Sequence, residues 1–151
     1  MRKKFIFIYV SLTFWSFTKP EIIPPNTNTW NIKIGDSLIM ATWLNNKMGD
    51  TAVIDLKKIN PKDTIYAQRY LCGAFAEDEQ CTLTIKNENG EVIGESKNTS
   101  NAWAYGVKMP LEEITNSNKF IKGQAMKVYF TIDFSGKAGV KTVLLCHLKF
   151  Q

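Results

Sequence analysis

MKVYFTIDF, residues 126–134, has the clearest strand pattern in the sequence. Apolar residues at positions 126, 128, 130, 132 and 134 alternate with Lys, Tyr, Thr and Asp, and this period of two is that of a β-strand. An amphipathic helix would instead place its apolar residues three or four positions apart. The stretch therefore predicts a strand that buries one face in a core and exposes the other to water.

Shorter stretches with the same alternation fill much of the remaining chain, and turn signals such as Gly35-Asp36 and Asn60-Pro61-Lys62-Asp63 separate them. About nine short strands are expected, at residues 30–34, 38–44, 52–56, 64–72, 81–85, 91–93, 103–109, 126–134 and 140–150. This pattern predicts an all-β fold, an antiparallel β-sandwich. The arrangement resembles immunoglobulin-like and C2-like sandwiches, which have so many functions that the resemblance implies no particular one.

A basic and then apolar segment begins the chain. Arg2-Lys3-Lys4 precedes residues 5–17, which are mostly apolar, and this order is that of a secretory signal peptide. The apolar segment is too short to cross a bilayer comfortably as a helix. We therefore expect export to the periplasm, the cell surface or the medium. The alternative interpretation is that residues 5–9 form a buried strand of the domain.

The cleavage signal is weaker than the export signal. Ser16 and Thr18 are small enough for signal peptidase, but Lys19-Pro20 directly after them makes a poor site. An uncleaved leader would tether the domain to a membrane through residues 5–17. The predicted organisation is a signal peptide or N-terminal anchor at 1–18, an extended tether rich in Pro, Asn and Thr at 19–29, and a β-sandwich domain at 30–151.

The charge of the chain is concentrated at its start. The sequence has 19 Lys and Arg residues against 14 Asp and Glu residues, a formal net charge of +5, and Arg2, Lys3 and Lys4 supply three of these charges. The remainder is nearly balanced and has no basic run interleaved with aromatics, so we do not expect nucleic-acid binding. Hydrophobic residues at 44% and charged residues at 22% are typical of a globular domain.

Two of the three cysteines flank a short segment between predicted strands. An oxidising compartment would allow Cys72 and Cys81 to form a disulfide, which is the pairing we predict. The alternative is that both are buried thiols. Cys146 alternates with Leu144, Leu148 and Phe150, so it is expected to pack with them as a small apolar side chain.

No familiar catalytic motif is present in the sequence. His147 is the only histidine, and its neighbour Cys146 on the same predicted strand would point to the opposite face, which excludes a dyad between them. There is no Gly-x-Ser-x-Gly elbow, phosphate-binding glycine loop or His-Glu-x-x-His helix. We therefore predict a structural His147, a chain that is not an enzyme, and no cofactor.

Two segments are candidate ligand sites. Glu77, Asp78 and Glu79 could offer oxygen ligands to a calcium ion, but their spacing matches no calcium loop, and a solvated loop tip is the favoured interpretation. Asn101, Trp103 and Tyr105 combine polar and aromatic groups, as carbohydrate and peptide sites do. The alternative is that the two aromatic residues face the core.

Two local predictions concern single residues. Arg69 lies among the apolar residues of its predicted strand, which indicates a strand at the edge of a sheet, with the guanidinium in water. In the hairpin around Asn89-Gly90, a four-residue loop that sets Lys86 opposite Glu91 avoids the like-charge pair that a two-residue loop would create.

These patterns lead to one main hypothesis and two alternatives. The export signal, the β-sandwich and the missing catalytic motifs favour an exported, non-enzymatic binding or interaction module for an unidentified protein or carbohydrate. The first alternative is an inhibitor or immunity-type protein that blocks the active site of a partner. The second is a carboxylate-dependent hydrolase, which would need two acids about 5 to 10 Å apart in a cleft.

Overall fold

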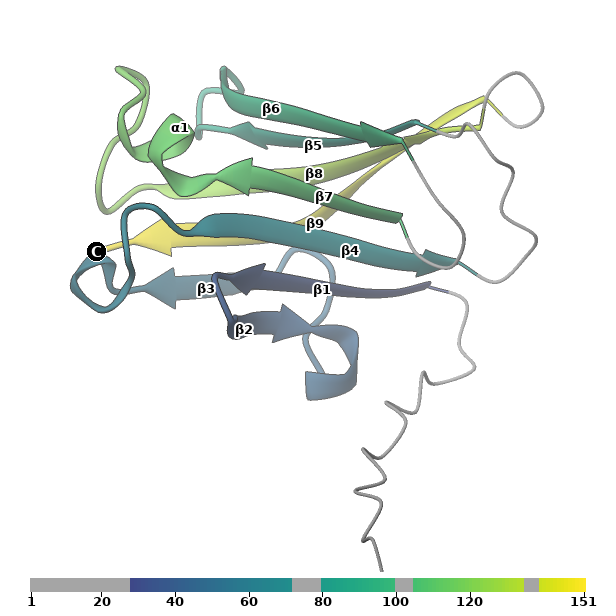
Figure 1. Cartoon of the computed structure of the whole chain (residues 1–151), viewed down its shortest axis with the longest axis horizontal. Coiled ribbons are helices and arrows are strands. Elements are labelled where there is room, and N and C mark those ends of the chain that lie inside the picture. The colour runs from purple at the N-terminus through teal and green to yellow at the C-terminus, as the bar shows by residue number, and fades with distance from the viewer. Residues whose placement is uncertain (1–27, 72–79, 100–104, 135–138) are drawn as a thin grey trace, which may run out of the picture.

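The computed structural model describes residues 28–71, 80–99, 105–134 and 139–151, which form two sheets packed face to face (Figure 1). The four-stranded sheet has the order β2 (Ser37–Ala41), β1 (Asn28–Ile34), β4 (Thr64–Leu71), β7 (Tyr105–Pro110). The five-stranded sheet has the order β3 (Thr51–Ile54), β9 (Val140–Phe150), β8 (Ala125–Asp133), β5 (Gln80–Lys86), β6 (Val92–Thr99). The predicted all-β sandwich is confirmed.

Three short helical segments connect strands: η1 (Thr42–Leu44), η2 (Leu56–Lys58) and α1 (Leu111–Thr115). α1 begins directly after Pro110, a residue that suits the start of a helix because it has no backbone N–H to satisfy. Its Leu111 and Ile114 are buried in the core, whereas Glu112 is exposed. Within the described ranges, no helix is long and apolar enough to cross a membrane.

The strand from which the fold was predicted is β8, and its alternation is complete. Its inward side chains are at most 1% exposed, and its outward side chains from 127 to 131 are half-buried. The inward set is Met126, Val128, Phe130 and Ile132. Phe130 is fully buried, so its replacement by alanine would cost about 3–5 kcal/mol. β8 lies between β9 and β5, at the centre of its sheet, and this explains why its pattern is the clearest.

One strand pair departs from the predicted antiparallel arrangement. β3 runs parallel to β9, with Thr51 opposite His147 and Ile54 opposite Phe150. The other pairs among the described strands are antiparallel. Parallel strands need a long connection between them. Here that connection is most of the domain, because β4 to β8 all lie between β3 and β9 in the sequence.

A β-bulge in β9 corrects the predicted surroundings of Cys146. Val128 of β8 lies opposite Cys146, but the next residue, Tyr129, lies opposite Leu144, so Leu145 is the extra residue of the bulge. Leu145 and Cys146 are both fully buried, and Leu144 is only half-buried. Cys146 therefore packs in the core as predicted, but Leu144 is on the other face, because an extra residue reverses the alternation.

Arg69 is not at a sheet edge, and the prediction of an edge position is wrong. It lies on β4 between β1 and β7, and its side chain is only 1% exposed. Its neighbours on the same face, Ile65 and Ala67, are fully buried. Burial lowers the pKa of the Arg69 guanidinium, because desolvation disfavours the charged form. Arginine is among the residues that are rarely fully buried, so the interior position of Arg69 is unusual.

The disulfide predicted between Cys72 and Cys81 is not present in the structure. Cys81 lies on β5, where it faces the core with Leu83 and Ile85 and is fully buried. Cys72 lies outside the described residues. The alternation of β5 explains the position of Cys81, since the inward face of a central strand is occupied by core side chains.

The β5–β6 hairpin has a different loop from the four-residue one predicted: five residues, 87–91, separate the two strands, and Asn87 and Glu91 close a tight turn within them. The turn is Glu88-Asn89-Gly90, because Asn87 N donates to Glu91 O at 2.9 Å and Glu91 N donates to Asn87 Oδ1 at 2.9 Å. Gly90 has a φ of 85°, which suits the left-handed position of a three-residue hairpin loop. Lys86 therefore lies opposite Val92, and the predicted pair Lys86–Glu91 is wrong.

Candidate functional site

The candidate residues from the sequence lie mostly beyond the described part of the structure. Asn101 and Trp103 fall outside the described residues, and so do the three acids Glu77, Asp78 and Glu79. Tyr105 begins β7, but the structure does not describe its side chain. These two predicted sites remain predictions.

His147 has a well-defined structural environment. Its Nδ1 lies 2.7 Å from Gly49 O, and its backbone N donates to Asp50 O at 2.8 Å. A carbonyl oxygen only accepts, so Nδ1 holds the proton of this hydrogen bond. Both contacts fix the segment before β3 against β9, which supports the predicted structural role. Among the described residues, no cluster of three or more His, Cys, Asp and Glu residues could hold a metal ion.

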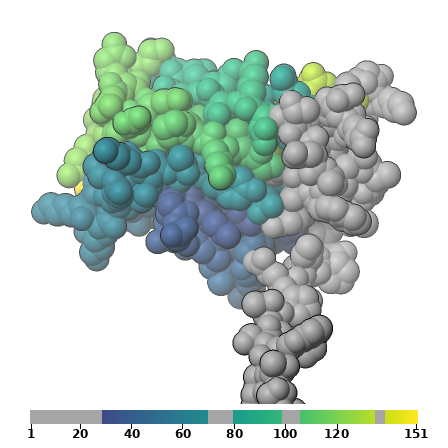
Figure 2. Space-filling view, in the orientation of Figure 1, coloured from purple at the N-terminus to yellow at the C-terminus, as the bar shows by residue number. Residues whose placement is uncertain are grey.

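A cleft of about 410 Å³ lies where the two sheets meet along β6 and β7. Its lining residues come from three strands: Tyr66 from β4, Lys97 and Asn98 from β6, Gly106 and Lys108 from β7. β6 and β7 are the edge strands of their sheets, and they run side by side in the fold (Figure 1). In the space-filling view, the green surface of β6, β7 and α1 continues into the teal surface of β4 (Figure 2).

Side chains of β6 connect the two edge strands. Asn98 Nδ2 donates to Gly106 O at 2.8 Å, and Ser96 Oγ donates to Lys108 O at 2.7 Å. Both carbonyls belong to the outer edge of β7, which has no further strand beside it in its own sheet. The two hydrogen bonds therefore satisfy an open sheet edge and fix the position of the cleft wall.

Tyr66 forms the floor of the cleft because position 106 has no side chain. A Cβ atom added at Gly106 would meet the Tyr66 hydroxyl and would lie 2.9 Å from its Cε2 atom, closer than real Cβ contacts. The two residues lie on neighbouring strands and are diagonal to each other, because Tyr66 is opposite Lys108 and Gly106 is opposite Gln68. The ring thus extends along β7 over the glycine.

The cleft is positively charged. Lys108 Nζ lies 5.8 Å from the centroid of the Tyr66 ring, a cation–π distance, and this lysine forms no ion pair with a described carboxylate. Lys97 Nζ lies 3.7 Å from Glu95 Oε1, an exposed pair of small energy. Burial raises the pKa of Tyr66, because desolvation disfavours the phenolate, so its hydroxyl is a neutral donor and acceptor at pH 7.

The same outer face continues as a row of amides. Asn31 of β1, Gln68 of β4 and Gly106 of β7 are paired across three strands, and Asn31 Nδ2 donates to Gln68 Oε1 at 3.3 Å. Lys33 lies opposite Tyr66 on β1. Asn31 is only 2% exposed, so the accessible polar groups that border the aromatic floor are Gln68 and Lys33, both half-buried.

The sequence pattern did not lead us to select Tyr66 as a site residue. A usable signal was Gly106, because a glycine within a strand often marks a close approach of another group. The partner of that approach lies 40 positions earlier in the chain, on another strand. No local pattern could identify it.

No family model matches the sequence, and the search of curated proteins found no similar protein.

Proposed function

We propose that the chain is an exported, non-enzymatic binding module and that the cleft between β6 and β7 binds a carbohydrate with an acidic group. The observation that supports this most directly is the Tyr66 ring at the floor of the cleft, with Lys97 and Lys108 beside it. An aromatic ring stacks on the apolar face of a sugar, and the lysines attract a carboxylate or sulfate on it.

The polar groups of the cleft fit the same ligand. Sugar hydroxyls need partners that both donate and accept, and the neutral Tyr66 hydroxyl, whose pKa burial raises further above its ordinary value, meets this need. Asn98 already donates to Gly106 O, so its amide oxygen is the atom left to accept from a ligand. A cleft of this size fits the small end of ligand pockets, about 300–1,000 Å³.

The composition of the cleft favours binding over hydrolysis. Among the described residues, its lining set contains two lysines, a tyrosine, an asparagine and a glycine, and no Asp, Glu or His. A hydrolase of the carboxylate type needs two acids across the scissile bond. The cleft lining offers a group to stack on the ligand and groups to attract it, but no pair of acids to transfer protons.

The ligand class is tested by calorimetric titration of the protein with an oligosaccharide of galacturonic acid and with the matched neutral oligosaccharide of galactose. We expect binding of the acidic chain and a loss of affinity of about tenfold or more in Tyr66→Ala, because the stacking surface is removed. Tyr129→Ala is the matched control, since Tyr129 also lies on an outer face near a lysine, with Lys86 Nζ 5.5 Å from its ring.

Three results would contradict this proposal. Equal losses in the two tyrosine variants would place the ligand elsewhere. Binding of an acidic peptide but of neither oligosaccharide would refute the carbohydrate class. Turnover of a glycoside that disappears in a carboxylate variant would show that the chain is an enzyme.

Export is tested separately, by fractionation of the producing cells and the intact mass of the protein. We expect the protein outside the cytoplasm, with a mass that shows whether residues 1–18 are removed or retained. A full-length chain found only in the cytoplasm would refute the export proposal, and it would leave the binding proposal untouched.

A further inference from the structure

Basic side chains meet on the outer face of the five-stranded sheet, away from the cleft. Lys86 of β5 lies opposite Lys127 of β8, which in turn lies opposite His147 of β9. Neighbouring strands are about 4.8 Å apart, so these three side chains begin within about 10 Å of one another. Lys149 points to the same face, since Leu148 and Phe150 beside it are buried. We call Lys86, Lys127, His147 and Lys149 the basic patch.

The lysines of the basic patch are not held in ion pairs. None of the three forms an ion pair with a carboxylate among the described residues. The carboxylates of the adjoining hairpin accept hydrogen bonds from neutral groups, because Glu88 Oε1 accepts from Ala125 N at 3.1 Å and Glu91 Oε2 accepts from Asn87 Nδ2 at 2.7 Å, so they reduce the net positive charge of this region but leave the lysine ammonium groups available. Like charges directly opposite each other destabilise a sheet, so this arrangement of Lys86 and Lys127 is unfavourable for folding alone.

His147 adds a fixed polar group to the basic patch. Its Nδ1 is occupied by Gly49 O at 2.7 Å, which orients the ring and leaves Nε2 as the remaining ring nitrogen. The ring is half-buried and therefore not freely rotating. An anionic group that approached Lys127 would meet this nitrogen on the neighbouring strand.

Apolar side chains lie among these cations on the same face. Val53 of β3 lies opposite Lys149 and is 60% exposed. Leu144 of β9 lies opposite Tyr129 of β8, and both are half-buried. Around the basic patch the face is therefore a mixture of lysines, aliphatic groups and one tyrosine, and two carboxylates lie farther along the same face: Glu95, opposite Thr84, and Asp133, opposite Gln80.

We propose that the outer face of the five-stranded sheet docks on an anionic lipid surface, with the basic patch at the headgroup phosphates. Lysines near such a surface are attracted to it, and exposed aliphatic groups gain by burial in the interfacial region. A tyrosine suits the same depth, because its ring is apolar and its hydroxyl is polar. Val53 favours lipid over a soluble polyanion, since a polyanion would engage the lysines but leave an exposed valine without benefit.

The basic patch and the cleft share no residue, so each can be tested without the other; Lys97, which lines the cleft from β6, is left unchanged in the basic patch variants. The experiment measures partitioning of the full chain onto vesicles of phosphatidylcholine alone and onto vesicles that also contain phosphatidylglycerol. The readout is the ratio of the partition coefficient on anionic vesicles to that on neutral vesicles. Any contribution of the apolar residues 5–17 raises both coefficients and therefore cancels in the ratio. We expect a ratio well above one, decreasing with added salt.

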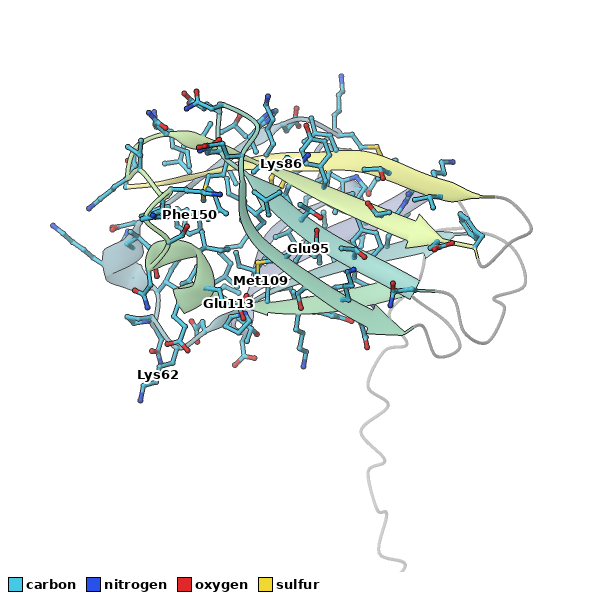
Figure 3. The ribbon with its side chains drawn as sticks, turned by 90° about the horizontal axis from the view of Figure 1, so that it is seen from above. Lys62, Lys86, Glu95, Met109, Glu113 and Phe150 are labelled. Atoms are coloured by element: carbon cyan, nitrogen blue, oxygen red, sulfur yellow. The ribbon has the colours of Figure 1, made fainter. Side chains whose placement is uncertain are left out.

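Charge-removing variants localise the interaction. Lys127→Gln should lower the ratio about fivefold, and the triple change Lys86→Gln, Lys127→Gln and Lys149→Gln about a hundredfold. The matched control removes the same charge outside both the basic patch and the cleft, at Lys57, Lys58 and Lys62, and should lower the ratio much less. Figure 3 shows Lys62 projecting from the opposite end of the molecule to Lys86. The unfolding midpoints of both triple variants are measured to confirm that each is folded.

Several outcomes would overturn the proposal. Equal losses in the two triple variants would show a response to net charge and not to a docking face. A ratio near one for the unmodified chain would refute lipid docking outright. Val53→Asn should weaken partitioning onto anionic vesicles and leave binding to dextran sulfate unchanged. If Val53→Asn has no effect on vesicles while the basic patch variants lose dextran sulfate, the occupant is a soluble polyanion.

Discussion

The two outer faces of the sandwich have the same pair of side chains, but the surroundings differ. Tyr66 on the four-stranded sheet lies near Lys108, at 5.8 Å, and Tyr129 on the five-stranded sheet lies near Lys86, at 5.5 Å. Tyr66 borders an edge strand with a glycine, and a cleft forms there. Tyr129 lies on a central strand, between Thr84 and Leu144.

This comparison shows that the aromatic residue does not itself make the cleft. A tyrosine on a central strand has side chains on both neighbouring strands, so these side chains lie against the edges of its ring. A tyrosine next to an edge strand becomes a floor only where the neighbouring position is empty, as at Gly106. The first test of this comparison is therefore to fill that position.

Gly106→Val should have the largest effect. The new side chain would displace the Tyr66 ring and close the cleft, with a loss of stability of about 1–3 kcal/mol from overpacking and no measurable binding of the acidic oligosaccharide. Urea unfolding and calorimetry measure the two effects. Thr131→Val is the control on the outer face of the five-stranded sheet. A side chain of similar size already occupies that position, so stability should change little. Normal ligand affinity in Gly106→Val would show that the ligand does not use the cleft.

The second test concerns titratable groups beneath the two faces. Burial raises the pKa of Cys146, under the five-stranded sheet, to about 12 from its ordinary value of 9.0. The unfolded chain therefore loses this proton first, so stability should be intact below about pH 9 and fall by about 1.4 kcal/mol per pH unit above it. Unfolding free energies at pH 8, 9 and 10 measure this slope.

Cys146→Val removes that thiol and should flatten the pH dependence between pH 9 and 10. Burial lowers the pKa of Arg69, under the other face, because it disfavours the charged form. Loss of a proton from Arg69 therefore does not reduce the stability of the fold in this pH range. An unchanged slope in Cys146→Val would show that another group is responsible.

The third test breaks the connection between the edge strands. Asn98→Ala removes the hydrogen bond to Gly106 O and should cost about 0.5–1.5 kcal/mol, because that carbonyl then depends on water. Thr142→Val, on the outer face of the five-stranded sheet, removes the exposed contact of 2.9 Å between Thr142 Oγ and Thr131 Oγ. This change should reduce stability less than Asn98→Ala does. Unfolding by urea compares them. A cost at Thr142 equal to that at Asn98 would contradict the structural role assigned to Asn98.

The smallest effect is expected from the two lysines above the tyrosines. Lys86→Gln and Lys108→Gln each remove an exposed cation–π contact worth about 0.5–1 kcal/mol. Lys86→Gln also relieves repulsion from Lys127, so its net cost should be the lower of the two. Thermal unfolding in parallel measures both. A larger loss in Lys86→Gln would indicate that Lys127 does not repel it appreciably.

The sequence was sufficient for the properties that depend on one strand at a time. Alternation in β8 predicted which of its side chains are buried. Arg69 was misplaced because alternation indicates a face but does not indicate whether a strand is central. The bulge at Leu145 was missed because the partner strand determines it, not the run of apolar residues in β9.

The cleft was beyond sequence reasoning for the same physical reason. Its residues come from β4, β6 and β7, and they meet only because two edge strands from different sheets run side by side. The basic residues of β6 and β7 that line the cleft are single lysines in strands whose side chains alternate between the two faces. Taken alone, such a lysine indicates only a solvated face. Only the tertiary arrangement brings Lys97 and Lys108 to one hollow.

The parallel pairing of β3 with β9 has a consequence for how the chain acquires its fold during synthesis. Gly49 and His147 are joined by a hydrogen bond across 98 positions of sequence, and Leu56 N donates to Gln151 O at 3.0 Å. β3 therefore has no partner until β9 has left the ribosome, and contacts of such long range slow folding. The β3 segment of a nascent chain should thus remain unpaired and accessible to chaperones until β9 has been translated.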